Sequence, residues 1–339
     1  MGRGAAALAV VLLHAEGMLL PGSSASTYGF GGLFKFGFLG VDFFFVLSGF
    51  IIYFVHADHI GKPALAISYI SRRAFRILPA YWAVLAFMLL SLPFQKIWPT
   101  ISTDWLFGQL VLLGKTLWVG QAWTLQHEFL FYGFFLLLIL IGRTAWLLML
   151  AWIVACVSIA YGKADVPRST LFDIVFHPYH AMFLVGIITA QMTRASARAW
   201  RYYCLSVSVS VFGCIAFLSY FNASLSSHSA NRYYCATAFG NACLVALIVM
   251  SRAKISTPKL FSWLGKISYS MYICHGLVFM VFYSLCIRMN AQALIAPVLI
   301  FTVGTLACIA VSALMQRWIE VPAIEFGKRF ATKLTPAKL

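Results

Sequence analysis

Apolar runs of roughly membrane-spanning length recur along this chain. An α-helix needs about 20 such residues to cross a hydrocarbon core about 30 Å thick. Only helices and closed β-barrels satisfy every backbone hydrogen bond inside a bilayer. The runs 129–141 and 291–314 are continuously apolar and lack the alternation of a barrel strand. The sequence therefore predicts an all-α fold, a polytopic membrane helix bundle.

Composition and charge agree with a membrane protein. Of the 339 residues, 62% are hydrophobic and 10% are charged, whereas soluble domains have about 45–50% apolar and about 25% charged residues. The net charge of +16 is spread between apolar runs, so we expect no nucleic-acid partner. The eight cysteines show no CxxC or zinc spacing and most lie inside apolar runs, as small buried residues do. No metal site is expected, because the histidines lack partners at ligand spacing.

Ten membrane spans are predicted, and no cleavable signal peptide is expected before the first. The run 104–119 is also apolar, but Asp104, Gln109 and Lys115 interrupt it. We expect an interfacial or re-entrant helix there. The predicted spans are 4–20, 36–56, 78–94, 123–142, 144–162, 171–192, 203–221, 233–250, 267–287 and 293–317.

The positive charges indicate the orientation of the bundle. Ten spans place both termini on one side, and 18 of the 25 Lys and Arg residues then lie on that side. Cytoplasmic loops carry the excess of Lys and Arg, so both termini are predicted to be cytoplasmic. Residues 1–322 form the predicted transmembrane domain. Residues 323–339 are expected to be a short basic cytoplasmic tail suited to anionic lipid headgroups.

An arginine and a histidine bracket the stretch RGAAALAVVLLH, from Arg3 to His14. Along a helix the two lie about 16 Å apart. If Arg3 lies at a membrane surface, His14 lies near the middle of the hydrocarbon core. An ionisable residue there is costly and is by default a functional-site hypothesis. The alternative is a histidine that only hydrogen-bonds between helices.

Three further ionisable residues fall inside predicted spans: Asp42, Glu128 and His275. Counting along the helices places Asp42 and Glu128 about 10 Å below the outer surface and His275 near mid-depth. An unpaired charge at depth costs about 2.5–3.5 kcal/mol, so a common polar site with His14 is predicted. Capping of a helix start is the alternative role for Asp42.

Other polar residues near these spans have structural interpretations. Glu16 lies two residues from His14, so it faces away around the helix, as a structural residue or near the outer mouth. His177 and His180 stand at the outer start of a span and are predicted to be interfacial. The role of His127 is left open.

Arg73 and Arg76 are spaced i, i+3 on one helical face at the mouth of the third span. Guanidinium forks bind phosphate oxygens bidentately. The alternative is an ordinary positive-inside anchor, with Tyr81 and Trp82 in the aromatic belt.

In this order the motifs resemble the acyltransferase 3 family of integral membrane O-acyltransferases, and its bacterial exopolysaccharide acetyltransferases in particular. Singly each motif is weak, but together they span nearly the whole chain and are specific. The motifs are the R-x10-H of Arg3 and His14, GVDFFFVLSGF at 40–50, the RxxR of Arg73 and Arg76 followed by ILPAYW, WTLQHEFLFY at 123–132, ISYSMYICH at 267–275 and WIEVP at 318–322.

The resemblance implies acyl transfer from cytoplasmic acyl-CoA, with acetyl-CoA as the expected co-substrate and no bound cofactor. The implied acceptor is a hydroxyl of a carbohydrate or lipid-linked saccharide, and the implied location is the bacterial cytoplasmic (inner) membrane, among its lipids. The essential histidine and arginine of the family fall on His14 and Arg3, and its acyl-CoA-binding RxxR falls on Arg73 and Arg76. Its motifs also mark Ser48, Trp123, Tyr132, Tyr269 and His275 as candidate site residues.

A thioester is already activated, so the protein must mainly deprotonate an alcohol and stabilise an oxyanion. Histidine, with a pKa near 6.5, suits the base role, and His14 is predicted to be the general base. Asp42 or Glu128 is predicted to orient its imidazole, as in a hydrolase triad. A covalent acyl-histidine relay is the alternative.

A proton-coupled transporter of a lipid-linked sugar or small metabolite is the alternative function. It would use the intramembrane histidines and carboxylates as a proton relay. Transporters often carry broken helix pairs at matching positions of two repeats. No such pair is visible in this sequence.

Overall fold

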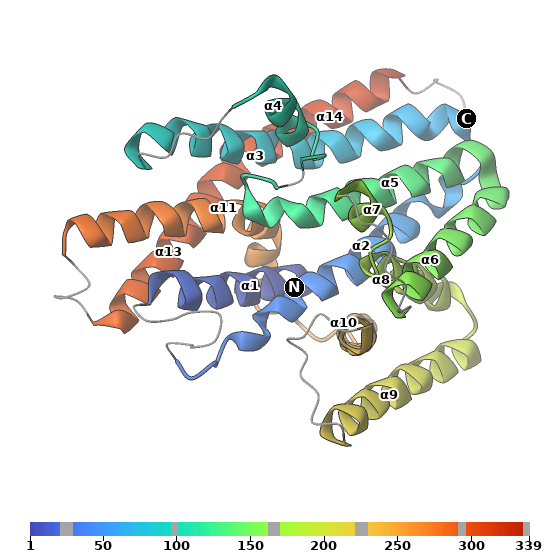
Figure 1. The fold of residues 1–339 in the computed structure, drawn as a ribbon. Helices are drawn as coiled ribbons and strands as arrows, with labels where there is room; N and C mark the ends of the chain where they lie inside the picture. The colour runs from blue at the N-terminus through green and yellow to red at the C-terminus, as the bar shows by residue number, and fades with distance from the viewer. Residues whose placement is uncertain are drawn as a thin grey trace.

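The computed structural model describes residues 1–20, 30–95, 101–114, 116–161, 170–220, 230–290 and 296–334, which form helices and no strands. The long helices are packed side by side (Figure 1). They are α1 (Gly2–Leu19), α2 (Leu39–His56), α3 (Ala66–Gln95), α5 (Trp123–Ile141), α6 (Ala145–Tyr161), α8 (Tyr179–Arg194), α9 (Ala197–Tyr220), α10 (Ala230–Arg252), α11 (Lys259–Arg288) and α13 (Pro297–Met315). Three shorter helices are α4 (Thr103–Leu110), α7 (Thr170–Val175) and α14 (Val321–Leu334).

The predicted spans correspond to these long helices, and the protein is a polytopic all-α membrane bundle. Nine stretches of the described residues are long and apolar enough to cross a membrane, and one of them, Gly120–Ala160, contains both α5 and α6. The predicted re-entrant run carries only α4, whose 8 residues are too few to cross. Residue 115 and the ends of several predicted spans lie outside the described residues.

The sixth predicted span is not one continuous helix. Its first residues form α7, and α8 begins only at Tyr179, after Pro178. Proline lacks a backbone N–H and disfavours helical geometry at the residue before it, which explains the interruption. The break places His177 between the two helices instead of inside a helix.

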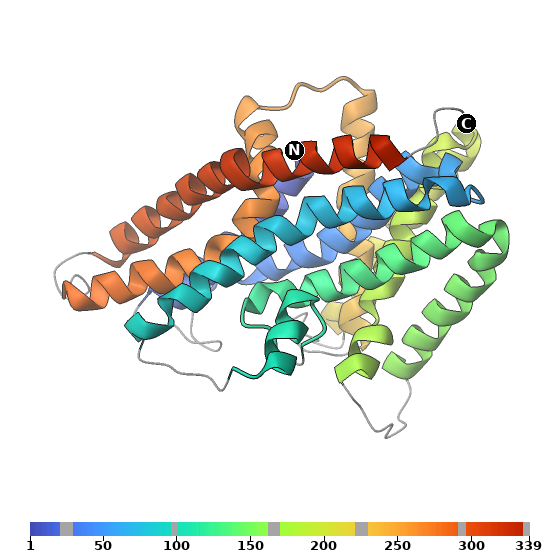
Figure 2. The ribbon, with the colours of Figure 1, turned by 90° about the horizontal axis from the view of Figure 1, so that it is seen from above.

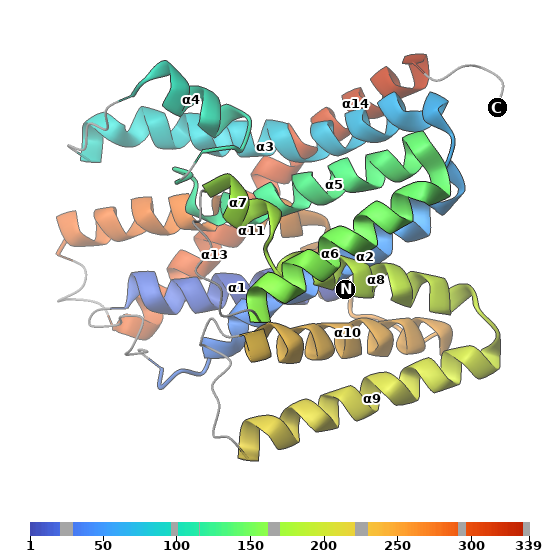
Figure 3. The ribbon, with the colours of Figure 1, turned by 45° about the vertical axis from the view of Figure 1, so that its right-hand side comes forward.

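Helices α2, α8 and α10 run in the same direction through the bundle. Arg194 Nη2, at the end of α8, donates to Phe54 O near the end of α2 at 2.7 Å. Arg252 Nη2, at the end of α10, donates to Thr193 O at 2.8 Å. Helix α5 has the same direction, and α9 and α10 lie side by side at the edge (Figure 3). The first turns of α2, α5, α8 and α10 therefore lie at the same end of the bundle.

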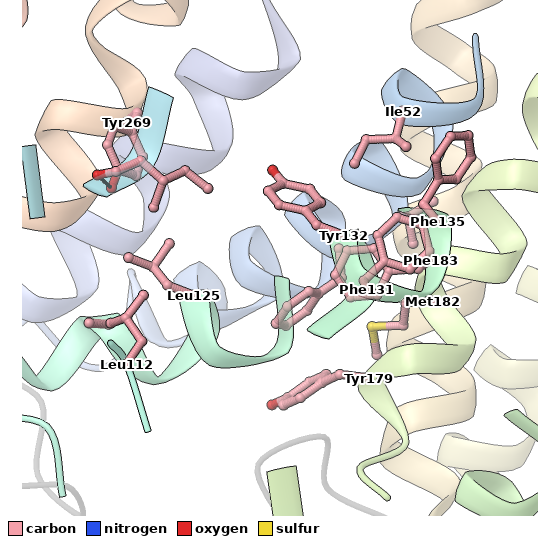
Figure 4. Packing of buried hydrophobic residues seen from close by; sticks show 14 of the residues in the cluster. Ile52, Leu112, Leu125, Phe131, Tyr132, Phe135, Tyr179, Met182, Phe183 and Tyr269 are labelled. Atoms are coloured by element: carbon pink, nitrogen blue, oxygen red, sulfur yellow. Dashed lines mark hydrogen bonds between the residues drawn. The ribbon is translucent and has the colours of Figure 1, made fainter. Parts of the chain in front are cut away.

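Backbone contact between α2 and α8 fixes this arrangement. A Cβ on Gly49 would collide with Phe183 O, and a Cβ on Gly186 would collide with Val46 O. Small residues allow such close approach between membrane helices. Beside this contact the rings of Phe131 and Phe183 stack with centroids 4.1 Å apart (Figure 4). The α2–α8 pair thus forms a rigid centre for the bundle.

Helix α1 begins inside the bundle, which corrects the predicted depth of Arg3. A Cβ on Gly2 would lie 3.0 Å from the ring of Phe43, in the second turn of α2. From there α2 continues to His56, about 20 Å further. Arg3 therefore lies beside the first half of α2, and the N-terminus is not at the end of the bundle (Figure 1). Hydropathy predicts the length of α1 but not its position along the axis of α2.

The predicted tail contains a helix that sequence patterns did not suggest. Helix α14 lies along α3 (Figure 2), where the rings of Phe326 and Phe330 pack 5.2 and 5.9 Å from that of Phe75. A π-helix, Gln316–Glu320, joins α13 to α14. Residues 335–339 lie outside the described residues.

We predict that Gly186→Ala lowers the stability of the protein. The added Cβ would meet Val46 O, so α2 and α8 must separate, and such overpacking costs about 1–3 kcal/mol. The melting midpoint of purified protein in detergent measures the effect. Gly213→Ala on α9 is the control, since its Cβ would meet no described atom within 4 Å. Equal melting of the two variants would contradict close α2–α8 packing.

Candidate active site

Helices α1, α2, α5 and α11 line a partly open cavity of about 70 Å³. This volume accommodates a few water molecules or a small chemical group. The polar side chains that line it are Arg3, Ser48, Thr124, Glu128, Ser268, Tyr269 and Tyr272. The remaining walls are apolar, so the cavity combines a few convergent polar groups with a hydrophobic enclosure, as binding sites do.

Glu128 holds the polar side of this cavity together. Ser48 Oγ donates to Glu128 Oε1 at 3.1 Å, and the Tyr132 hydroxyl donates to the same oxygen. Arg3 lines the same cavity, close enough for its charge to interact with that of Glu128. The sequence places Arg3 and Glu128 at different depths, whereas the structure brings them together.

Arg73, Arg76 and Arg3 form a line of guanidinium groups, the arginine line, which leads from the beginning of α3 to the cavity. The Arg73 guanidinium lies over the rings of Tyr69 and Tyr132, at 5.9 and 5.7 Å from their centroids. Arg76 follows one turn later on α3, and its charge interacts with that of Arg3. The predicted site arginines are therefore neighbours in space.

Glu320 is a member of this charged group that was not selected from the sequence. It is 4% exposed, and Ser270 Oγ donates to its Oε2 at 2.7 Å. Its charge interacts with those of Arg76 and Arg3. The π-helix turns Glu320 inward, and π-helical turns are frequent at functional sites. The available signal was an acidic residue directly after an apolar span, in WIEVP.

His14 and His275 lie together, as the sequence predicts, with ring centroids 4.8 Å apart. His14 Nδ1 lies 2.8 Å from Val10 O, and His275 Nδ1 lies 2.7 Å from Tyr272 O. A carbonyl oxygen only accepts, so in each neutral ring Nδ1 carries the proton and Nε2 carries the lone pair. Each ring of the pair therefore keeps the lone pair of its Nε2 available as a hydrogen-bond acceptor.

The carboxylate predicted to orient His14 has other partners, so that prediction is wrong. His14 Nδ1 is bound by the carbonyl of Val10, four residues earlier in its own helix. Glu128 accepts from hydroxyl groups in the cavity, and Asp42 forms a salt bridge with Arg232 at 3.2 Å. A backbone carbonyl therefore sets the tautomer of His14.

Asp42 and Arg232 form a buried ion pair between α2 and α10, with side chains 1% and 7% exposed. Asp42 lies in the first turn of α2, where a negative charge is favourable; among the described residues its Oδ2 accepts from Arg232 and its Oδ1 has no hydrogen-bond partner. The Arg232 guanidinium lies 5.2 and 5.0 Å from the ring centroids of Phe38 and Tyr233. The pair ties the beginnings of the two helices together.

Five rings from α2, α5, the α7–α8 connection and the start of α8 form a contiguous group beside the cavity, called the aromatic cluster here: Phe45, Trp123, His127, His177 and Tyr179. Tyr179 stacks on Phe45 at 4.7 Å and on His177 at 4.3 Å, and Trp123 lies 5.3 Å from Tyr179. His127 lies 4.8 Å from His177. Trp123 is 37% exposed, and Phe45 also lines the cavity. The aromatic cluster therefore connects the cavity to the surface.

Two remaining sequence predictions have different outcomes. Glu16 is buried and accepts a hydrogen bond from Phe30 N at 2.7 Å, in agreement with a structural role. His180 is fully buried inside the protein and its Nε2 lies 2.8 Å from Ile174 O, while its location at the membrane interface stays a prediction. The break before α8 turns this residue inward.

Within the described part of the chain, no group of three His, Cys, Asp or Glu side chains has a geometry that would hold a metal ion. A family model described as an acyltransferase domain matches residues 1–317. No curated protein and no solved structure matches the chain.

We predict that Asp42→Leu destabilises the protein by about 3–5 kcal/mol, because it removes the carboxylate that compensates the buried charge of Arg232. The double variant Asp42→Leu/Arg232→Leu should regain much of this loss, because no isolated charge remains. Melting midpoints of the two single variants and the double variant measure the coupling. A double variant less stable than both single variants would contradict the pairing.

Proposed function

The chain belongs to the acyltransferase 3 family, and from that membership we propose that it transfers an acetyl group from acyl-CoA to a carbohydrate hydroxyl. At the coarser level it is a multi-pass membrane acyltransferase. The observation that supports the proposal best is the arginine line, which ends at a small, partly open cavity one side chain away from a pair of histidines.

Acyl-CoA carries phosphates at one end and the thioester at the other, and the arginine line matches that polarity. Arg73 and Arg76 would bind the phosphates through their guanidinium forks. Arg3 lies further inside, at the cavity. The bundle end at which α3 begins faces the cytoplasm in this proposal, because the excess of Lys and Arg lies on that side.

The size of the cavity supports a short acyl group. About 70 Å³ accommodates an acetyl group, and the apolar walls suit its methyl group. Tyr272 lines the cavity, and its ring centroid lies 6.0 Å from that of His275. The acyl group would thus be held one side chain away from the histidine pair, and Tyr272 would have to turn aside for transfer.

His14 would act as the general base through the lone pair on Nε2. The acceptor O–H proton moves to His14, the alcohol oxygen attacks the thioester carbonyl carbon, and the C–S bond breaks. The CoA thiolate then takes the proton, which leaves an ester and free CoA. The carbonyl of Val10 on Nδ1–H would take the orienting place of the carboxylate in a hydrolase triad.

The aromatic cluster supports a carbohydrate acceptor. Sugar rings present apolar C–H faces and a rim of hydroxyls, so they suit aromatic side chains that combine a flat face with a polar tip. Trp123 offers an exposed face, and the next residue, Thr124, has its Oγ1 3.0 Å from Tyr272 OH. An acceptor on Trp123 would therefore approach the histidine pair along Tyr272. An exopolysaccharide or lipid-linked sugar at the bacterial inner membrane fits this arrangement.

We predict that substitution of the phosphate-binding arginines and substitution of His14 impair different steps, binding and turnover. Arg73→Ala/Arg76→Ala should abolish acetyl-CoA binding. His14→Ala should keep binding but slow acetyl transfer and acetyl-CoA hydrolysis by about 100-fold or more. Binding and turnover are measured with purified protein in nanodiscs.

The exposed Arg198 supplies the control for that experiment, since Arg198→Ala removes a positive charge far along the chain from the site. It should bind acetyl-CoA like the wild type. Well-folded wild-type protein that binds no acetyl-CoA would contradict the proposed function and favour the transporter.

We predict that Trp123→Ala raises the KM for a carbohydrate acceptor by about 3- to 10-fold, because the stacking surface is lost. Hydrolysis of acetyl-CoA without acceptor should keep its rate, and Trp123→Phe should restore most of the affinity. Trp263→Ala, which removes another exposed indole, is the control. An unchanged acceptor KM in Trp123→Ala would rule out the aromatic cluster as the acceptor site.

A further inference from the structure

Two histidines that the sequence did not single out hold the outermost member of the arginine line. Arg73 Nη2 lies 2.7 Å from His56 Nε2, and His56 Nδ1 lies 3.2 Å from His59 Nδ1. His56 is the last residue of α2 and is 3% exposed, while His59 is half-buried. The three side chains form a continuous chain of hydrogen bonds.

The direction of each hydrogen bond in this chain follows from the chemistry of arginine. A guanidinium has donors and no acceptor, so His56 Nε2 must accept from Arg73. His56 is then neutral with its proton on Nδ1, and that N–H donates to His59 Nδ1. His59 in turn carries its proton on Nε2. The geometry therefore requires one defined tautomer for each of the two rings.

The surroundings of Arg73 leave His56 as the group that sets its direction. The Arg73 guanidinium lies over the rings of Tyr69 and Tyr132. These ring contacts limit the position of the guanidinium but do not fix the direction of its N–H groups. Its Nε is buried and has no hydrogen-bond partner among the described residues. The ring of Tyr69 also packs edge-on against that of His56, with centroids 5.1 Å apart.

The charged groups around the two histidines are mostly basic. Arg73 and Arg72 face His56, and Arg72, Lys62 and Asp58 face His59. A neutral imidazole acceptor adds no further positive charge beside Arg73.

We infer that His56 is a positioning residue that aims Arg73 at a phosphate of acyl-CoA, and that His59 fixes the tautomer in which His56 can do so. The inference rests on the proposed function, in which Arg73 binds acyl-CoA. It adds His56 and His59 as two residues that support Arg73, the group that binds the phosphate. Loss of the support should weaken binding of the phosphate-bearing donor and leave the chemical step unchanged.

Matched substitutions separate the hydrogen bond from mere space filling. His56→Phe fills the space but removes the acceptor, and it should weaken acetyl-CoA binding about tenfold with kcat unchanged. His56→Gln offers an amide oxygen near the position of Nε2 and should bind nearly as the wild type does. His59→Phe should cause a smaller loss than His56→Phe, and His59→Asn, with its oxygen near the position of Nδ1, should restore binding.

A second donor identifies the part of the ligand that is affected. S-acetyl-pantetheine carries the thioester without the phosphates of acetyl-CoA. The full-length variants and wild type in nanodiscs should use this donor with equal KM. Nitrogen-15 NMR of histidine-labelled protein, assigned by comparison with His56→Gln and His59→Asn, should show His56 protonated on Nδ1 and His59 on Nε2.

The outcomes distinguish the inference from the function on which it rests. Wild-type protein that does not bind acetyl-CoA overturns both. Binding that is lost in Arg73→Ala but normal in His56→Phe overturns only the positioning role. Equal losses in His56→Phe and His56→Gln, or a resonance that shows His56 protonated on Nε2, overturn it as well. The NMR result decides the question even if His56→Phe does not fold.

Discussion

Charge inside an apolar bundle is stable only where opposite charges or hydrogen bonds compensate it, and the centre of this molecule is built on that requirement. Arg3 and Arg76 come from α1 and α3, and the carboxylates that face them come from α5 and the π-helix. Four segments that are distant in the sequence must therefore meet at one place. The cavity forms beside this group because its charged side chains cannot close it with apolar contacts.

Helix α2 connects every part of the site. From its beginning to its end, Asp42 binds Arg232, Phe45 joins the aromatic cluster, Ser48 donates to Glu128, and His56 accepts from Arg73. These groups keep their mutual spacing because they share one helix, at about 1.5 Å per residue. The backbone contact at Gly49 and Gly186 holds that helix in the bundle. Backbone packing between α2 and α8 thus helps to set the geometry of the groups that α2 carries.

Hydropathy predicts the ten long helices because each span must cover the hydrocarbon core by itself, whatever its neighbours are. The pairing of His14 with His275 could also be expected, because two polar residues inside apolar spans are most stable together. The level of Arg3 could not, since it depends on how Gly2 packs against Phe43. The ion pair of Asp42 with Arg232 could not be predicted either, because in the sequence Arg232 is a single basic residue at the edge of a span.

The histidines show how the bundle controls protonation without adding charge. A carboxylate beside an intramembrane imidazole would favour its charged form, whereas a backbone carbonyl or a guanidinium selects a tautomer and leaves the ring neutral. Tyr272 O and Val10 O direct the lone pairs of His275 and His14 to Nε2. Arg73 donates to His56 Nε2, so this nitrogen must carry the lone pair and the proton of His56 lies on Nδ1. A neutral ring with one free lone pair is the form that a general base requires, and a neutral acceptor is the form that leaves an arginine free to bind an anion.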